Sequence, residues 1–179
     1  MSTTVRFSVP EFDRMIQAGV FAERANQRIE LIYGEMREVN PPNPPHEDIV
    51  DKLMYWSMDR APRDQVRIRI QNSLGIPALD SLTIPDVAWM VARDYHRQRP
   101  EPADVLLLIE VADSTLQSDR KEKGPLYAAA GIQEYWIVNV TTSVWKLIEI
   151  RWMVHIHSCR QSILATRWHR LRFPNGHWT

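Results

Sequence analysis

The sequence of 179 residues has only one cysteine and no long apolar run. The single Cys159 excludes an internal disulfide framework and any zinc site built from several cysteines. No stretch approaches the roughly 18 apolar residues of a membrane span, and the N-terminus (MSTTVRFSVPEF) has no signal-peptide core. Hydrophobic residues make up 44% and charged residues 25% of the chain, near the globular average. We therefore expect a soluble, cytoplasmic globular protein with no membrane partner.

The chain also has no excess of either charge, with 22 basic and 22 acidic residues. A zero balance argues against a nucleic-acid binder, because such proteins usually carry a basic surplus. The charges are unevenly placed, however. All 22 acidic residues precede residue 150, whereas residues 150–179 contain five arginines and no acidic residue. Lysine is scarce as well, with four lysines against 18 arginines, so the role of each lysine needs an explanation.

Local patterns in the first half predict a helix, a hairpin and a second helix. Ser8 and Glu11 have the spacing of a capping box, and the helix that they open is expected to stop at Gly19. Apolar residues alternate over residues 28–39, which predicts a β-hairpin that turns near Gly34. The sequence NPPNPP at 40–45 predicts a stiff connector that is neither helix nor central strand. Helical spacing of apolar residues follows over 46–60.

The second half alternates strands with one helix. Strands are predicted over 66–70, 83–90, 104–112, 134–140 and 144–150. Asp119 and Glu122 form a second pair with capping-box spacing, and Gly131 can close the helix that they open. A strand, a helix and a strand over 104–140 have the length of a right-handed crossover, so the two strands should be parallel. The predicted fold class is α/β, with a mixed β-sheet flanked by helices.

Two carboxylates near strand ends and one lysine are the candidates for chemistry. Asp86 lies on one predicted strand, and Glu110 lies near the end of the most hydrophobic strand of the chain. A buried carboxylate is costly unless it is paired or binds a metal. Lys123 follows in the first turn of the next predicted helix, so the three could form a metal site with a lysine beside it. The structural alternative for Glu110 is a salt bridge to one of the arginines.

Five blocks of the sequence resemble one family. These are IELIYGE (29–35), a proline-rich loop that ends in His46, PDVAWM (85–90), ADVLLLIEVADST (103–115) and DRKEKGPLYAAAGIQEYWIV (119–138). Over about residues 5–145 the chain resembles the bacterial Uma-type restriction endonucleases, a branch of the PD-(D/E)XK nuclease superfamily. The resemblance implies a restriction-endonuclease-like core and hydrolysis of phosphodiesters that depends on magnesium.

The resemblance also implies which residues form the catalytic site. Asp86 resembles the acidic residue of the PD motif, and Glu110 resembles that of the (D/E)XK motif. Ala112 stands where the superfamily motif has its lysine, and Lys123 on the following helix matches the lysine of this branch. Glu30 resembles a further acidic residue beside the metal. Taken singly, each residue has a structural explanation: Asp86 as a turn cap, Glu30 on a solvent-facing hairpin edge, and Lys123 in a solvated basic run.

The implied mechanism is an in-line attack on the phosphodiester by a metal-activated water. Asp86 and Glu110 would bind Mg²⁺ (or Mn²⁺), together with a backbone carbonyl such as that of Val111. Lys123 would position the water or stabilise the transition state. Gln71 and His46 are candidates for substrate binding, with solvent exposure and local packing as their alternatives. The implied partner is nucleic acid, with DNA favoured, and a homodimer stays open as the assembly. The alternative function is a catalytically inactive nuclease fold that binds nucleic acid or protein.

The last segment departs from this resemblance. We divide the chain into a nuclease-like domain at 1–149 and an atypical basic segment at 150–179, which holds five arginines, four of the six histidines and three of the seven tryptophans. Three explanations compete: a basic arm for phosphate contacts, a divergent edge strand, and sequence read out of frame. The third predicts that the core stays folded, with cooperative unfolding, when the chain is truncated near Ile150.

Overall fold

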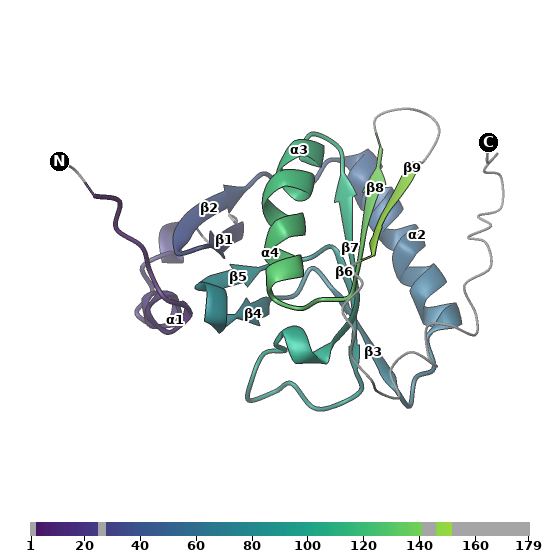
Figure 1. Ribbon diagram of the computed structural model, residues 1–179, viewed down its shortest axis with the longest axis horizontal. Coiled ribbons are helices and arrows are strands. Elements are labelled where there is room, and N and C mark those ends of the chain that lie inside the picture. The colour runs from purple at the N-terminus through teal and green to yellow at the C-terminus, as the bar shows by residue number, and fades with distance from the viewer. Residues whose placement is uncertain (1–2, 25–27, 141–145, 152–179) are drawn as a thin grey trace.

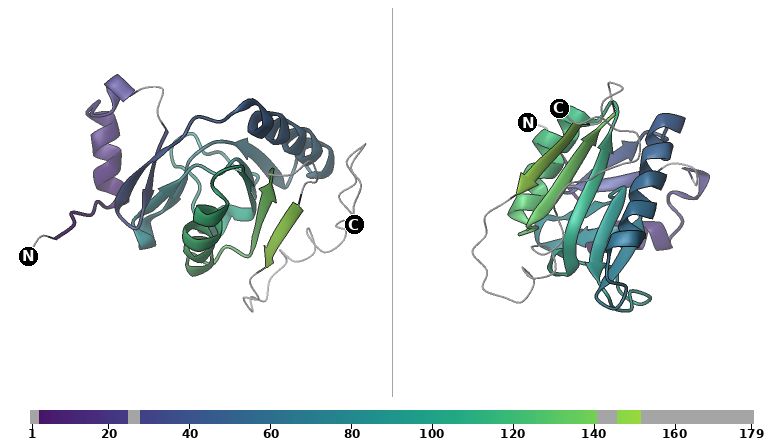
Figure 2. Two further views of the ribbon diagram at one scale, coloured as in Figure 1. Left: turned by 90° about the horizontal axis from the view of Figure 1, so that it is seen from above. Right: turned by 90° about the vertical axis from the view of Figure 1, so that its right-hand side faces the viewer.

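The computed structural model describes residues 3–24, 28–140 and 146–151. Two β-sheets form its centre, one with four strands in the order β2-β1-β5-β4 and one with five strands in the order β3-β6-β7-β8-β9. Helix α2 covers one face of the five-stranded sheet, and helices α3 and α4 lie on the other side (Figures 1 and 2). The four-stranded sheet and helix α1 lie at the far end from α2. In this described part, no helix is long and apolar enough to cross a membrane.

The N-terminal helix and hairpin are confirmed. Helix α1 spans Val9–Gln17, and its first turn has the capping box of Ser8 and Glu11, with the Ser8 backbone N–H donating to Glu11 Oε2 at 2.8 Å. Strands β1 (Arg28–Ile32) and β2 (Glu35–Val39) pair antiparallel. The turn between them is formed by Tyr33 and Gly34, which both have positive φ, 49° and 80°. Two consecutive positive φ values match the right-handed twist of the flanking strands.

The proline-rich stretch is partly helical, so the prediction of a connector over 40–45 is wrong at its end. Helix α2 spans Pro44–Arg60 and begins two residues earlier than expected. Asn43 is the N-cap, and its side-chain oxygen accepts the backbone N–H of His46 at 3.1 Å. Proline fits the first turn of a helix because the N–H that it lacks would have no helical partner there. The prolines therefore start the helix that presents His46.

The five-stranded sheet is mixed, as predicted. Strands β7 (Val105–Ala112) and β8 (Glu134–Asn139) are parallel, which confirms the crossover, and the other pairs are antiparallel. Strand β3 spans Val66–Ile70, and β9 spans Lys146–Arg151. The residues between β8 and β9 and the basic segment from 152 to 179 lie outside the described residues. All residues of β7 are buried, as expected of a central strand.

One predicted strand proves to be two. Instead of a continuous strand over 83–90, β5 (Ser81–Thr83) ends before Pro85, and β6 (Val87–Val91) starts after Asp86. Strand β5 pairs with β1 and with β4 (Leu74–Ile76), a strand that the sequence analysis missed, whereas β6 joins the five-stranded sheet. Proline has no N–H for a ladder bond, so a break at Pro85 lets the chain cross from one sheet to the other. Asp86 lies at this crossing.

The helix after β7 starts earlier than predicted. Its segments are α3 (Leu116–Ser118), a π-helical turn (Asp119–Lys123) and α4 (Gly124–Ala129). Asp119 and Glu122 thus lie inside the helical stretch and form no capping box, and Lys123 lies about two turns into it. Pro125 offers no N–H to the carbonyl of the preceding turn, and a π-helical turn is a common local response to such a gap. Gly131 closes the stretch with φ 79°, as predicted.

Two apolar cores hold these layers together. Ile49, Val50 and Leu53 of α2 pack against one face of the five-stranded sheet. Leu126 and Tyr127 of α4 pack against the other face, together with residues of β4. Short 3-10 turns complete the described structure; they span Ala22–Arg24, Pro77–Leu79 and Pro102–Asp104. The polar residues discussed below lie where β6 begins, β7 ends and the two sheets meet.

Candidate active site

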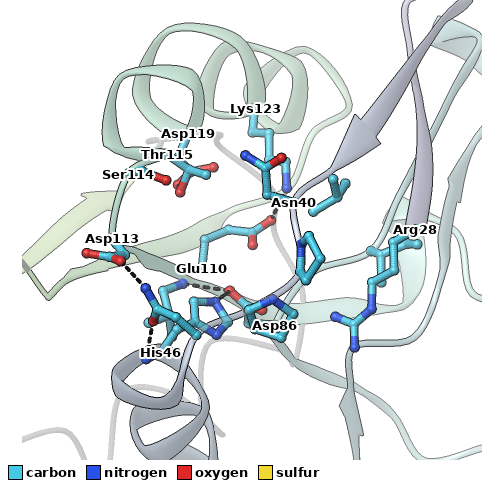
Figure 3. A pocket seen from close by; sticks show the side chains of 16 residues that line it. Arg28, Asn40, His46, Asp86, Glu110, Asp113, Ser114, Thr115, Asp119 and Lys123 are labelled. Atoms are coloured by element: carbon cyan, nitrogen blue, oxygen red, sulfur yellow. Dashed lines mark hydrogen bonds and ion pairs between the residues drawn. The ribbon is translucent and has the colours of Figure 1, made fainter. Parts of the chain in front are cut away.

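A pocket of about 100 Å³, with many charged residues in its lining, lies at the meeting point of the two sheets (Figure 3). Its walls come from the start of β1, the loop into α2, the beginning of β6, the end of β7 and the helical stretch after it. The charged residues in its lining are Arg28, His46, Asp86, Glu110, Asp113, Asp119 and Lys123. Three of the four residues predicted as catalytic line this pocket, and the fourth, Glu30, contacts one of them.

Asp86 is held by three hydrogen-bond donors. Its Oδ2 accepts the backbone N–H of Val111 at 2.8 Å and lies 3.2 Å from His46 Nε2, and its Oδ1 accepts Gln71 Nε2 at 3.1 Å. Burial by itself would raise the pKa of Asp86, but the hydrogen bond and charge of His46, with the Val111 and Gln71 donors, lower it below its ordinary value. Hydrogen bonding to Asp86 in turn raises the pKa of His46. The side chain of Asp86 is therefore an ionised carboxylate.

Glu110 and Lys123 form a buried ion pair. Lys123 Nζ lies 3.0 Å from Glu110 Oε1, and Tyr127 Oη donates to the same oxygen at 3.2 Å. Burial raises the pKa of Glu110 well above its ordinary value. The charge of Lys123 lowers this pKa, but the negative charges of Asp86, Asp119 and Glu30 raise it again. Both side-chain hydrogen bonds of Glu110 within the described residues use Oε1, and neither uses Oε2.

Glu30 joins the four-stranded sheet to this pair. It lies on β1 and is only 3% exposed, so the alternative of a solvent-facing hairpin edge is wrong. Its Oε1 accepts the backbone N–H of Ile84 at 2.7 Å and lies 3.2 Å from Lys123 Nζ. Burial alone would lower the pKa of Lys123, but Glu110 and Glu30 raise it well above its ordinary value. Lys123 is therefore a fixed cation rather than part of a solvated basic run.

The two candidates for substrate binding also lie at the site. His46, in the first turn of α2, contacts Asp86, and Gln71, at the end of β3, bonds to Asp86 through its side chain. Gln71 has φ 51°, and its backbone N–H donates to the carbonyl of Asp86 at 3.0 Å. A positive φ is an uncommon backbone conformation for a non-glycine residue and needs support from its surroundings. Both amide ends of Gln71 are engaged, because Arg28 donates to its Oε1 at 2.6 Å.

Asp119, Tyr127 and Arg28 belong to the site but were not predicted from the sequence. Asp119, interpreted there as a helix cap, is buried and accepts Thr115 Oγ1 at 2.7 Å, and burial raises its pKa. Tyr127 is fully buried against Glu110. Asp119, Lys123 and Tyr127 follow one another at intervals of four, which places them on one helical face, and this spacing was a usable signal. Arg28 gave no signal of its own in the sequence.

The residues fit a hard cation in chemistry, although no complete cage is present. Asp86, at the residue before β6, and Glu110, on β7, could supply carboxylate oxygens. The Val111 N–H donates to Asp86 Oδ2, and in an extended strand the C=O of a residue lies on the same side as its N–H, so the Val111 carbonyl stays a candidate third ligand. Among the described residues, no group of three or more His, Cys, Asp or Glu side chains is arranged to hold a metal ion. One or two carboxylates, completed by water, is the usual arrangement for Mg²⁺ but not for Zn²⁺.

The fold is a mixed α/β fold with the pocket at the junction of its two sheets. The family model described as "putative restriction endonuclease", Uma2, matches residues 9–174, and the chain belongs to this family. The match runs past residue 145, where the resemblance in the sequence ends, and it includes most of the basic segment. The division into a domain at 1–149 and a separate segment at 150–179 stays a prediction.

A solved structure supports the same fold. The crystal structure of a putative nuclease belonging to DUF820 from Anabaena variabilis ATCC 29413 superposes with a TM-score of 0.57 at 13% sequence identity. The alignment covers 80% of this chain and 85% of that one. No curated protein matches the chain. The predicted restriction-endonuclease-like α/β class is therefore confirmed at the level of the fold.

Proposed function

We propose that this protein is an endonuclease that hydrolyses nucleic-acid phosphodiester bonds, with DNA as the favoured substrate and Mg²⁺ or Mn²⁺ as the cofactor. The observation that carries the proposal is the position of Lys123, whose Nζ lies 3.0 Å from Glu110 and 3.2 Å from Glu30. A largely buried lysine beside strand-borne carboxylates, in a pocket lined by charged residues, is a typical arrangement for stabilising negative charge on a transferring phosphoryl group. The family membership of the chain agrees with this chemistry.

The charge of the pocket supports a bound cation. Four acidic side chains line it, those of Asp86, Glu110, Asp113 and Asp119, against three that can carry a positive charge, those of Arg28, His46 and Lys123. An anionic phosphodiester would be repelled by this excess unless further positive charge entered with it. Asp86 and Glu110 would hold that charge as Mg²⁺ or Mn²⁺. When bound, such an ion lowers the pKa of water and neutralises charge on the phosphate.

The chain's own residues then have separate roles. His46, Gln71 and the Val111 N–H keep Asp86 ionised and fixed in position. Glu30 and Tyr127 orient Lys123 and Glu110 within the buried part of the site. Lys123 would place its ammonium group near the phosphate oxygens that gain charge as the bond breaks. Such preorganised groups need no rearrangement during the reaction.

Plasmid nicking tests the proposal. Supercoiled DNA is incubated with the wild type in Mg²⁺, Mn²⁺ or EDTA, and with Asp86→Ala and Lys123→Ala. We expect nicking that requires the metal and falls by at least ~100-fold in both variants. Lys121→Ala is the matched control, because Lys121 is an exposed lysine on the same turn as Lys123, and we expect wild-type activity. Activity that survives both site substitutions would reject the assignment.

The same assay distinguishes an endonuclease from the alternative, a catalytically inactive nuclease fold. Folded wild-type protein that cuts no nucleic acid with any divalent metal, on DNA or on RNA, would contradict the proposal and favour a catalytically inactive module. Binding of a labelled duplex without cleavage would then identify the module as one that binds nucleic acid.

A further inference from the structure

Of the residues lining the pocket, Arg28, His46 and Lys123 are the ones that can carry a positive charge. Lys123 lies between two carboxylates, Glu110 and Glu30, and His46 pairs with Asp86. The charges of Lys123 and His46 are thus balanced by buried acids within about 3 Å. Arg28 differs from both, because it forms no ion pair within the described residues and its side-chain partner is the neutral amide of Gln71.

The contacts of Arg28 fix it beside the proposed metal ligand. One terminal nitrogen of its guanidinium donates to Gln71 Oε1 at 2.6 Å, and Gln71 Nε2 donates to Asp86 Oδ1 at 3.1 Å. Gln71 therefore bridges the cation and the carboxylate and keeps them apart. Figure 3 shows the Arg28 guanidinium on the opposite side of Asp86 from His46. The side chain is half-buried, so it is held in place but open to the pocket.

We propose, on the basis of the proposed function, that Arg28 is the residue that binds a backbone phosphate of the nucleic-acid substrate, and that Gln71 is its positioning residue. Arginine suits this role because its planar guanidinium has five N–H donors and can bind phosphate through two of them. Gln71 uses one nitrogen of the guanidinium and leaves the other donors for a ligand. This assignment replaces direct substrate contact by Gln71, since both ends of its amide are already bonded.

The chain offers a matched control in Arg60. Like Arg28, Arg60 makes no ion pair within the described residues, and it is exposed at the last residue of α2. Helix α2 starts near the pocket with His46, and at ~1.5 Å per residue Arg60 lies roughly 20 Å further along the axis. Arg28→Ala and Arg60→Ala remove the same charge, one inside the pocket and one far from it.

The test is binding of a fluorescent 20-base-pair DNA duplex by anisotropy in Ca²⁺, a cation that takes carboxylate oxygens as ligands and supplies the positive charge of the site. A gel run in parallel checks that the duplex stays intact. We expect Arg28→Ala to weaken binding by about 10-fold or more and to reduce the slope of log affinity against log salt by about one. Arg28→Lys should recover part of the affinity, because it keeps the charge. Arg60→Ala should change the affinity by less than about twofold. Thermal unfolding of each variant checks that it is folded.

A double-mutant cycle tests the role of Gln71. Gln71→Leu should weaken binding in the wild type and have little further effect in Arg28→Ala, a coupling that separate structural roles would not produce. Equal affinities of Arg28→Ala and Arg60→Ala would overturn the assignment of Arg28 while the nicking assay still supports an endonuclease. Should Arg28→Ala fail to fold, the assignment is tested on Arg28→Lys and Arg28→Gln, and equal salt slopes for these two would overturn it. A wild type that neither binds nor cuts nucleic acid would overturn both proposals.

Discussion

Asp86, just before β6, and Glu110, on β7, line one pocket, yet the surroundings of the two carboxylates differ. Asp86 receives hydrogen bonds from a backbone N–H, an amide and an imidazole, and its pKa is lowered. Glu110 shares one lysine with Glu30, lies among further acids, and has a raised pKa. Each is less than a tenth exposed, so burial does not explain the difference.

In this pocket, the pKa of a buried carboxylate depends on how many hydrogen-bond donors surround it. Two fixed dipoles, the Val111 N–H and the Gln71 amide, and one titratable ring, that of His46, keep the Asp86 carboxylate ionised. A single cation shared by two carboxylates leaves an unbalanced negative charge, which a protein tolerates at a cost in stability. Pairs of carboxylates with pKa values pushed apart are typical of catalytic sites. The Glu110 half of the pocket is therefore where an added cation would stabilise the protein most.

Removal of Lys123 should have the largest effect on stability. We expect Lys123→Met to lower the free energy of unfolding by about 3–5 kcal/mol at pH 8, because Glu110 and Glu30 would lose their shared cation. His46→Ala is the comparison for the other half, and about 1–3 kcal/mol is expected because Asp86 keeps its Val111 and Gln71 donors. Urea unfolding in EDTA measures both. Equal losses in the two variants would contradict the contrast between the halves.

Divalent metal should stabilise the protein by a smaller amount. A ligand present at 100 times its Kd stabilises the folded state by about 2.7 kcal/mol, so Mg²⁺ or Mn²⁺ should raise the melting temperature of the wild type. The increase should vanish in Asp86→Asn and in Glu110→Gln, and Lys121→Ala should keep it. Thermal unfolding at constant ionic strength is the measurement. An equal increase in all four proteins would show that the metal binds elsewhere.

The smallest expected effect concerns Tyr127, whose hydroxyl is the second donor to Glu110. Tyr127→Phe should cost about 1 kcal/mol, the usual value of one hydrogen bond, because the ring stays packed in the core. Tyr55→Phe is the control, since Tyr55 is 65% exposed and should show no change. Both are measured by urea unfolding. A loss for Tyr127→Phe as large as that for Lys123→Met would mean that the hydroxyl, not the lysine, stabilises Glu110.

Two pairs of residues with the same spacing show which local structure the sequence predicts correctly and which it does not. Ser8 and Glu11 form the predicted capping box at the start of α1. Asp119 and Glu122 have the same spacing but lie inside the helical stretch, because the helix already begins at Leu116. A capping box needs only local contacts. The first residue of the helix after β7 depends also on where β7 ends in the sheet.

The sheets show the same limit. Strands β3, β7 and β8 were predicted within one or two residues of their bounds. Alternating or consecutive apolar residues in the sequence match the burial of these strands. The short β4 was missed and the break at Pro85 was read as one strand, because three-residue strands have no measurable period. That break nevertheless places Asp86 beside the end of β7.

The sequence by itself determined the residue types of the site and their order: two strand-borne acids, a rare lysine on the next helix and a further acid on the hairpin. The family that this order resembles also follows from the sequence. Only the tertiary structure decided that Glu30 is buried against Lys123, that Gln71 and His46 both bond to Asp86, and that Arg28 has no acidic partner within the described residues. Most of these contacts join residues that are 40 to 93 positions apart in the chain; the pair of Gln71 and Asp86 is the exception. Such pairings depend on how two sheets meet, which no local pattern encodes.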